Sequence, residues 1–165
     1  MLFRSVVKGH VEPMIELGVG FNPELSGREN IFLNAAIHGR DPKIVKNRID
    51  ELVEWAGLSE VIDLPLRTYS SGMVARLGFA VATDINPDIV LVDEVLAVGD
   101  IDFMDKSRAR MEKIMGEGST VVLVSHDLET VKSLATRAIW MEHGKIKAQG
   151  SPAAVIEQYI SNAHG

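Results

Sequence analysis

The sequence contains no cysteine, which excludes both a disulfide framework and a thiolate metal site. The same absence fits a reducing compartment. Basic residues are outnumbered, because 17 lysines and arginines face 23 aspartates and glutamates and leave a formal net charge of −6. A protein that holds nucleic acid through its phosphates needs a basic surface, so this charge argues against a nucleic-acid partner.

Long apolar runs are absent as well, since no stretch approaches the roughly 20 residues that a membrane-spanning helix needs. The longest runs, such as residues 120–124, have the length of a strand. Residues 1–5 are too few for the apolar region of a signal peptide. They are similar to the translation of a sequencing adapter, which favours a foreign start, although a natural start stays open. We expect a cytoplasmic, water-soluble chain.

What is present suffices for one folded domain. Apolar residues make up 46% of the 165 residues, so a core can form and disorder is not expected. We assign residues 6–165 to a single partial domain. Within it we distinguish a mostly helical unit over 23–84, a strand-rich core over 85–150 and a last helix over 151–165.

Local signals place the helices of the helical unit. Ser26 and Glu29 have capping-box spacing and predict a helix start. Asp41 followed by proline predicts a second start, and Gly57 a helix end. The second helix shows apolar residues at helical spacing on one face: Val45, Ile49, Leu52, Val53 and Ala56.

The core shows two unbroken apolar runs, residues 89–92 and 120–124, typical of strands covered on both faces of a parallel sheet. A helical pattern separates them, so strand, helix and strand predict a βαβ unit. Residues 143–144 predict a hairpin turn. The last helix is expected to direct four residues inward: Val155, Ile156, Tyr159 and Ile160.

The first of these runs ends in Asp93 and Glu94. Strands of open parallel sheets present side chains to a crevice at their carboxyl ends, where ligands bind. Asp93 would hold Mg²⁺ through the metal's water shell, because Mg²⁺ keeps several waters. Glu94 would orient or deprotonate an attacking water. An apolar strand that merely meets a polar loop gives the same pattern, so the signal alone is weak.

Two further signals are weak by themselves. Ser70, Ser71 and Gly72 stand at a predicted helix start, where free N–H groups and the helix dipole favour an anion such as phosphate. Ordinary N-capping needs only one serine and explains the same residues. His126 follows the second run and could donate to a phosphate oxygen at the sheet edge of Asp93, but a lone histidine is more often structural.

The order of these signals makes the pattern specific. A Ser-Ser-Gly helix start, an acid pair, residues 97–100 and a Ser-His pair follow one another, and in this order the chain resembles the nucleotide-binding domain of an ABC transporter. Residues 69–73 match its signature motif, Asp93 and Glu94 its Walker B pair, and His126 its switch histidine. The stretch 97–100, ending in Asp100, matches the D-loop, and 18–30 is similar to the branch that exports cell-surface polysaccharides, including O-antigen and teichoic acid.

The resemblance implies an α/β fold: an incomplete P-loop NTPase (ABC ATPase) domain, with a parallel-sheet core half and a helical subdomain. It implies ATP and Mg²⁺ as cofactors, and it divides the site into catalytic, metal and nucleotide-binding residues. In this division Glu94 and His126 are catalytic and Asp93 is the metal ligand. The nucleotide-binding residues are Ser70, Ser71, Gly72 and Asp100. It also implies a head-to-tail homodimer, in which the signature acts on the partner's nucleotide. An integral membrane permease would hold this dimer at the inner face of the cell membrane.

The chain departs from the family's pattern in two places. No stretch reads GxxxxGK[ST], so the chain lacks the backbone cradle and the lysine that bind the phosphates. We therefore interpret it as truncated before this Walker A loop and expect it, alone, neither to bind ATP tightly nor to hydrolyse it. The Q-loop glutamine is also missing, and near its place stands Asn22, which either substitutes for it or leaves the role unfilled.

Two other functions stay open. A non-transport ABC ATPase of DNA maintenance or translation would show coiled-coil heptads, or a second domain and a basic linker, and neither is visible. A non-catalytic interaction module is the second alternative, against which the retained Asp93, Glu94 and His126 count.

Overall fold

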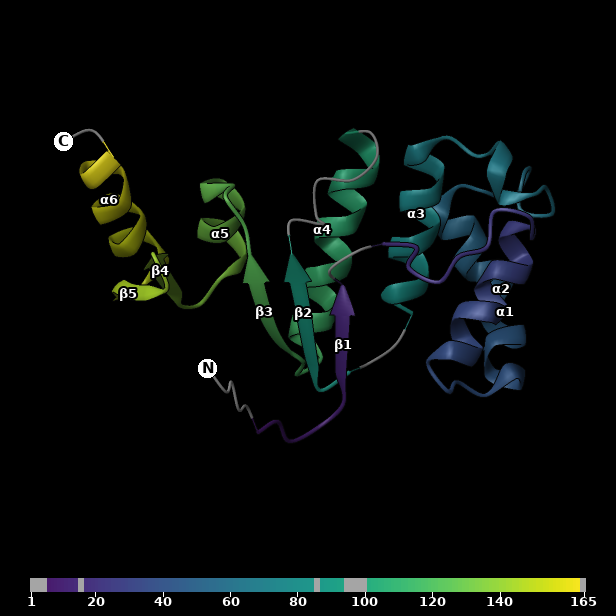
Figure 1. Ribbon diagram of the computed structural model, residues 1–165, viewed down its shortest axis with the longest axis horizontal. Coiled ribbons are helices and arrows are strands. Elements are labelled where there is room, and N and C mark those ends of the chain that lie inside the picture. The colour runs from purple at the N-terminus through teal and green to yellow at the C-terminus, as the bar shows by residue number, and fades with distance from the viewer. Residues whose placement is uncertain (1–5, 15–16, 85–86, 94–100, 164–165) are drawn as a thin grey trace. The chain divides into compact units, whose positions relative to one another are not determined.

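The computed structural model describes residues 6–14, 17–84, 87–93 and 101–163 (Figure 1). The chain forms two compact units, Met1–Val122 and Leu123–Gly165. The elements up to the boundary are β1 (Val11–Met14), α1 (Gly27–Ile37), α2 (Pro42–Ala56), the 3₁₀ helix η1 (Leu66–Thr68), α3 (Ser71–Ala82), β2 (Ile89–Asp93), α4 (Ile101–Gly116) and β3 (Thr120–Val124), which crosses it. The second unit continues with α5 (Leu128–Leu134), β4 (Ala138–Glu142), β5 (Lys145–Gly150) and α6 (Pro152–Ala163).

Three strands form a sheet in the order β1-β2-β3. β1 and β2 are parallel, with Val11 opposite Ile89 and Met14 opposite Val92. The N–H of Thr120 at the start of β3 donates to the Asp88 carbonyl oxygen before β2 at 2.9 Å. The three arrows point the same way in Figure 1. β2, α4 and β3 therefore follow one another as the predicted strand, helix and strand.

The prediction that both faces of β3 are covered is wrong. Its residues alternate between exposed and half-buried, and Val122 and Val124 are 50% and 59% exposed. β3 is the outer strand of the described sheet, whereas β2 lies between two neighbours. The apolar run is therefore covered less completely than that of β2, although the two look alike in sequence.

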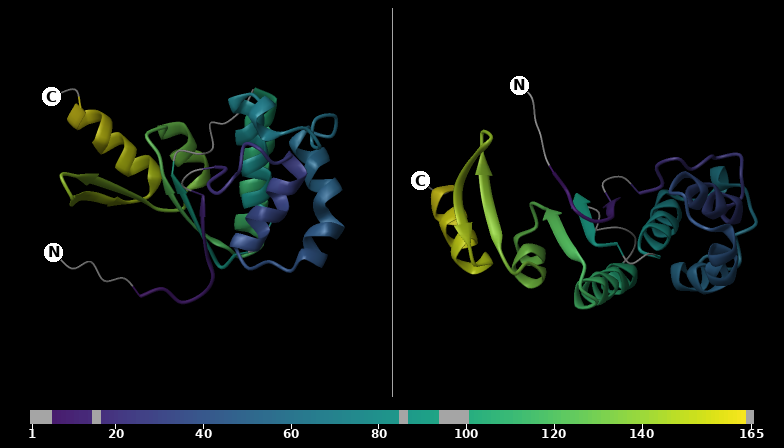
Figure 2. Two further views of the ribbon diagram at one scale, coloured as in Figure 1. Left: turned by 45° about the vertical axis from the view of Figure 1, so that its right-hand side comes forward. Right: turned by 90° about the horizontal axis from the view of Figure 1, so that it is seen from below.

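Helices α1, α2 and α3 pack against one another, as Figure 2 shows, around a buried cluster. The predicted apolar face of α2 supplies Val45, Ile49, Leu52, Val53 and Ala56 to this cluster. Three aromatic rings extend the packing to α4, because Phe103 lies edge-on to Trp55 of α2 at 5.2 Å and to Phe79 of α3 at 6.0 Å between ring centroids. Among the described residues, no helix is both long and apolar enough to cross a bilayer.

The predicted caps of the helical unit are confirmed. The Ser26 hydroxyl accepts from Glu29 N–H at 3.2 Å, and the Glu29 carboxylate accepts from Ser26 N–H at 2.8 Å. Asp41 accepts from Lys43 N–H at 2.8 Å at the start of α2. Gly57 ends α2 in the left-handed region at φ 67°. Each cap satisfies backbone groups that a helix end leaves without a helical partner.

The capping box makes stability depend on pH. Hydrogen bonds from the Ser26 backbone and then its hydroxyl lower the pKa of Glu29 from its ordinary 4.5. A lowered carboxylate pKa stabilises the fold above the unfolded value, and this stabilisation is lost as pH falls through the folded value. We therefore expect Glu29→Gln to be less stable than the parent at neutral pH, with the difference vanishing in acid.

Urea unfolding followed by circular dichroism at neutral pH and at a series of pH values falling well below 4.5 measures this difference. Ser26→Ala should cost about 0.5–2 kcal/mol at neutral pH, because it removes the N-cap oxygen. Glu54→Gln, which changes an exposed acid of α2, is the matched control. A Glu29→Gln variant whose deficit is equally large at both pH values would contradict the assignment.

In the second unit β4 and β5 form an antiparallel hairpin. His143 (φ 48°) and Gly144 (φ 74°) both lie in the left-handed region at its two-residue turn, as predicted. α6 contacts this hairpin, with Trp140 edge-on to Tyr159 at 5.5 Å between ring centroids. Of the four residues expected to point inward, Val155 is buried and Tyr159 contacts the hairpin but stays 43% exposed. Ile160 is 44% exposed, because two strands and a short helix cover only part of α6.

Candidate functional site

The predicted metal ligand Asp93 ends strand β2. Val90 and Val92 of this strand are 1% and 2% exposed, whereas Asp93 is exposed. The carboxylate thus stands at the carboxyl end of a parallel strand, where α/β folds bind ligands. Among the described residues, no group of three or more histidines and acids could hold a metal ion. A single carboxylate suits Mg²⁺, which uses one or two of them and keeps several waters.

The described structure does not test whether the other predicted site residues lie near Asp93. Glu94 and Asp100 lie outside the described residues, so their roles stay predictions. His126 is exposed and follows β3 in the second unit, whereas Asp93 belongs to the first. The convergence of Asp93, Glu94 and His126 on one rim therefore stays a prediction.

The predicted anion site at the start of α3 is a capped helix N-terminus. Ser70 has extended backbone, and its Oγ accepts from Met73 N–H at 3.2 Å. Ser70 and Ser71 are exposed and Gly72 is half-buried, so the three lie together at an open helix start. A β-carbon on Gly72 would meet Ser70 Oγ at 3.9 Å, an ordinary contact. Packing within the described chain therefore does not require glycine at this position.

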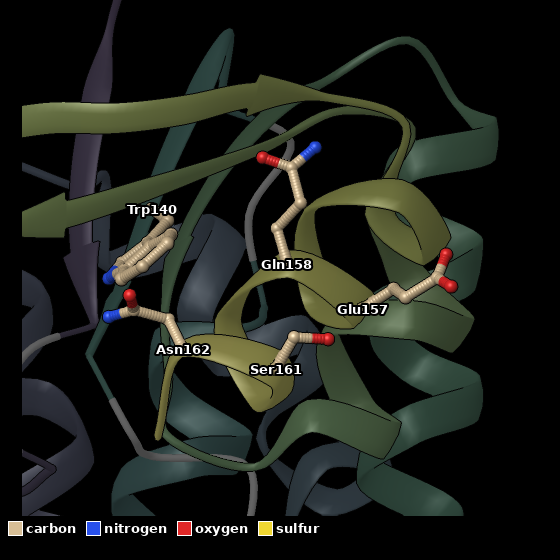
Figure 3. A pocket seen from close by; sticks show the side chains of 5 residues that line it. All are labelled: Trp140, Glu157, Gln158, Ser161 and Asn162. Atoms are coloured by element: carbon tan, nitrogen blue, oxygen red, sulfur yellow. The ribbon is translucent and has the colours of Figure 1, made fainter. Parts of the chain in front are cut away.

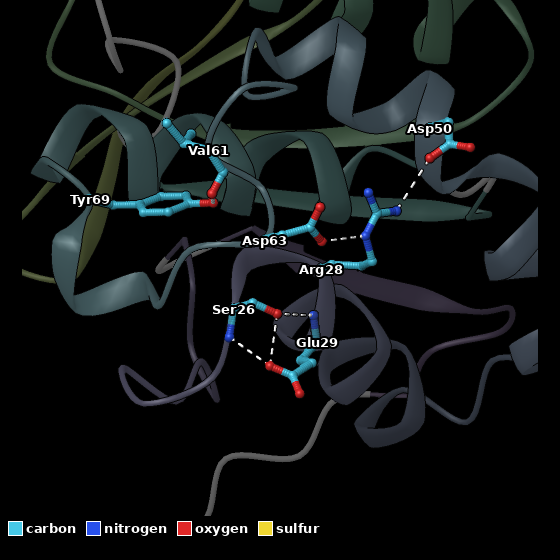
Figure 4. Close-up of polar contacts among 7 residues, drawn as sticks. All are labelled: Ser26, Arg28, Glu29, Asp50, Val61, Asp63 and Tyr69. Atoms are coloured by element: carbon cyan, nitrogen blue, oxygen red, sulfur yellow. Dashed lines mark hydrogen bonds and ion pairs between the residues drawn. The ribbon is translucent and has the colours of Figure 1, made fainter.

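Sequence reasoning included Tyr69, the residue directly before this cap, in the signature motif but gave it no role. Its ring is 9% exposed, and its hydroxyl donates to the Val61 carbonyl oxygen at 2.7 Å (Figure 4). Burial, followed by the negative charge of Asp63, raises the pKa of Tyr69. An aromatic residue immediately before a Ser-Ser-Gly helix start is the signal that could have identified it.

Figure 4 also shows Arg28 of α1 between two acids. Its Nε donates to Asp63 at 2.7 Å, and its Nη1 donates to Asp50 of α2 at 3.3 Å. These hydrogen bonds, above all the one to Asp63, raise the pKa of Arg28. The Asp50 and Asp63 side chains are 89% and 72% exposed, so these ion pairs add little to the stability of the fold.

Arginines hold the opposite end of α3. Arg40 and Arg110 donate to the carbonyl oxygens of Val81 and Thr83 at 3.1 and 3.2 Å. The carbonyls at a helix C-terminus are the negative end of its dipole, so these cations stabilise it. Asp84 follows and pairs with an α2 arginine at 2.8 Å. Burial raises the pKa of Asp84 more than the neighbouring arginines lower it.

A family model described as ABC transporter matches residues 6–97, more than half of the chain. The chain belongs to the ABC transporter family. It is 45% identical over 151 residues to the O-antigen export system ATP-binding protein RfbB of Klebsiella pneumoniae, covering 92% of this chain and 61% of that protein. It is 44% identical over 156 residues to the teichoic acids export ATP-binding protein TagH of Lactococcus lactis, covering 94% of this chain and 33% of that protein. The chain thus spans about one third to three fifths of these relatives.

Two solved structures share the ABC transporter fold of this chain. One, described as an ATP binding subunit of an ABC transporter, superposes with a TM-score of 0.78 at 21% identity and covers 91% of this chain and 62% of that one. The other, a dimeric ATP-binding cassette in a post-hydrolysis state bound to ADP and Pi, gives 0.70 at 22% identity, with 87% and 63% covered. The predicted fold, a partial P-loop NTPase with a parallel sheet and helices, is confirmed.

A shallow depression elsewhere in this ABC transporter chain involves none of the predicted site residues. It lies in the second unit, at α6 and Trp140 of β4 (Figure 3). The lining residues are Trp140, Glu157, Gln158, Ser161 and Asn162. The family match ends at residue 97 and therefore includes Ser70 and Asp93 but neither Asp100 nor His126.

Proposed function

We propose that this chain supplies the signature and Walker B portions of an ATP-hydrolysing motor subunit in an ABC exporter. The observation that carries the proposal is that one ABC transporter family match, over residues 6–97, contains both Ser70 at a capped helix start and Asp93 at the end of a parallel strand. Relatives named for O-antigen export and teichoic acids export support a cell-surface polysaccharide or lipid-linked glycan as cargo.

The residues at the two described positions fit ATP and Mg²⁺. Asp93 is an exposed carboxylate with the donor chemistry that Mg²⁺ prefers, and it would hold the ion through water. When bound, Mg²⁺ would neutralise charge on the phosphates. At α3, a β-carbon on Gly72 would make only an ordinary contact in the described chain, so packing does not require glycine there, which favours a role in close approach of a phosphate.

Each remaining residue has a role in the proposed reaction. Glu94 accepts a proton from the attacking water or orients it, and His126 donates to the γ-phosphate. Ser70 and Ser71, with the N–H groups of the α3 start, donate to the γ-phosphate held by the partner subunit. Asp100 contacts the nucleotide from the D-loop. ATP favours the closed dimer, because only that state pairs the γ-phosphate with both sets of donors.

The assembly follows from the same proposal. Two nucleotide-binding domains close head to tail, and the helical unit over residues 23–84 couples closure to an integral membrane permease. The protein would then lie on the cytoplasmic face of the cell membrane. The formal charge of −6 supports the exclusion of nucleic acid as a partner.

A fusion protein tests the proposal directly. In it, the amino-terminal segment of the Klebsiella pneumoniae relative that this chain does not match precedes this chain. We expect Mg²⁺-dependent ATP hydrolysis by the fusion protein and none above background by the chain alone, which has no GxxxxGK[ST] lysine for the phosphates. Colorimetric phosphate release measures both.

The fusion protein also provides its own controls. Asp93→Asn should raise the Mg²⁺ concentration that half-maximal hydrolysis requires, because it removes the proposed ligand. Asp105→Asn, which changes an exposed acid of α4, should leave that concentration unchanged. Turnover by the purified chain alone, free of contaminating ATPases, would disprove the expected inactivity. A folded fusion protein without turnover would contradict the proposed function.

A further inference from the structure

The loop before α1 and the loop before α3 are joined by main-chain hydrogen bonds. Leu66 N–H donates to the Leu25 carbonyl at 2.8 Å, and Arg67 N–H donates to the Pro23 carbonyl at 2.9 Å. In the opposite direction, N–H groups at the start of α1 donate to carbonyls of the same segment between α2 and α3. These bonds are Arg28 to Ile62 at 3.0 Å and Gly27 to Leu64 at 3.3 Å.

Tyr69, directly before α3, adds a side-chain hydrogen bond to these main-chain bonds. Its ring is 9% exposed, and its hydroxyl reaches the Val61 carbonyl oxygen at 2.7 Å. The ring occupies space that Gly27 leaves open, because a β-carbon on Gly27 would stand 2.5 Å from the Tyr69 hydroxyl oxygen and 2.8 Å from Ile62 Cδ1. Gly27 is helical, so space rather than a left-handed backbone requires glycine there.

We propose that Tyr69 is a positioning residue, which fixes the start of α3, and therefore Ser70, against α1 through its lock on Gly27 and Val61. The inference rests on the proposed function, since it concerns the phosphate contacts assigned to Ser70. Ser70 and Ser71 are themselves exposed, whereas Tyr69, the residue directly before Ser70 in the chain, is buried. A displacement of about 1 Å at a catalytic contact can cost two orders of magnitude in rate, so such a contact needs a rigid neighbour.

The contacts of Tyr69 with Gly27 and Val61, which we call the lock, predict how substitutions at Tyr69 and Gly27 combine. Tyr69→Phe keeps the ring but removes the oxygen, so it frees the α3 start and leaves the Val61 carbonyl without its donor. Gly27→Ala inserts a methyl group against that same oxygen. The double variant should therefore recover part of what Gly27→Ala loses, because phenylalanine has no oxygen at the contact. Tyr159→Phe changes the other tyrosine, which is 43% exposed, and is the matched control.

The first measurement uses the chain alone. Amide hydrogen exchange at residues 73 and 74, whose N–H groups donate to the Ser70 side chain and carbonyl, should be about 3- to 10-fold faster in Tyr69→Phe, as expected when one hydrogen bond is lost. Exchange within α2 should stay close to the parent. Equal exchange at residues 73 and 74 in Tyr69→Phe, Tyr159→Phe and the parent would overturn the inference.

The second measurement uses the fusion protein. Tyr69→Phe should lower kcat about 10-fold with little change in KM for ATP, because the partner subunit's own phosphate contacts remain. Gly27→Ala should lower kcat further, and the double variant should exceed it at least several-fold. Turnover in Tyr69→Phe equal to that of Tyr159→Phe, or no recovery in the double variant, would overturn the inference.

Ser70→Ala separates the two hypotheses. If it abolishes turnover while Tyr69→Phe leaves turnover and exchange unchanged, the inference is wrong and the proposed function stands. If Ser70→Ala turns over like the parent, the proposed role of the signature is wrong, and with it the catalytic consequence of the lock. The exchange measurement on the chain alone still decides whether Tyr69 fixes the helix start.

Discussion

In the fusion protein, Glu94→Gln is expected to lower ATP turnover by about 10²- to 10⁴-fold, the usual contribution of a positioned general base. Glutamine has nearly the same shape as glutamate and keeps an oxygen that can orient water, but it cannot take up the proton. The position follows Asp93 at the end of β2, next to the proposed metal ligand. ATP binding and ATP-dependent dimerisation should therefore persist while the chemical step fails.

Single-turnover hydrolysis and size-exclusion chromatography with ATP measure the two halves of this expectation. Glu117→Gln is the matched control, because Glu117 is an exposed acid whose partner is Lys113, one helical turn away at 3.8 Å. A Glu94→Gln variant that cycles at the parental rate would refute the role given to Glu94. A variant that loses both hydrolysis and nucleotide binding would point to a role in assembling the site instead.

Phe79→Ala is expected to lower the free energy of unfolding by about 3–5 kcal/mol, the range for truncating a buried phenylalanine. Phe79 is 0% exposed, and its ring stacks on Trp55 at 5.9 Å and meets Phe103 edge-on at 6.0 Å between ring centroids. Truncation leaves a cavity where α2, α3 and α4 meet, and the remaining rings cannot fill it without moving three helices.

Urea unfolding followed by circular dichroism and by the fluorescence of Trp55 measures this loss. Trp140→Phe in the background removes the only other tryptophan, so the fluorescence reports on the first unit alone. Ile44→Ala in α2, whose side chain is 60% exposed, is the control and should change stability by no more than about 0.5 kcal/mol. Equal losses for Phe79→Ala and Ile44→Ala would contradict the described packing.

Sequence reasoning succeeded where the physical cause is local. The caps at Ser26, Asp41 and Ser70 depend on one side chain and N–H groups two or three residues further on, so the sequence contains every participant. Gly57 and the turn at 143–144 depend on residues that tolerate a left-handed backbone. The aliphatic run before Asp93 likewise predicted a buried strand that ends in an acid.

It failed where partners far apart in the chain decide the outcome. The runs of β2 and β3 look alike, but only their place in the sheet determines how well each is covered. Tyr69 meets Gly27 across many intervening residues, and no local pattern reports a β-carbon that would collide with a distant hydroxyl. The predicted meeting of Asp93 and His126 also depends on partners far apart in the chain, and it stays a prediction because the two residues belong to separate units.

The two ends of α3 are held in different ways, and this has a geometric consequence. Arg40 and Arg110 grip the carbonyl end, while Ser70 precedes the first turn at the other end. A helix of 12 residues is about 18 Å long, so a small rotation about the arginine-bound end moves the other end by a larger distance. A tilt of α3 by only about 5° about that end would move Ser70 by about 1.5 Å, enough to make or break a phosphate contact.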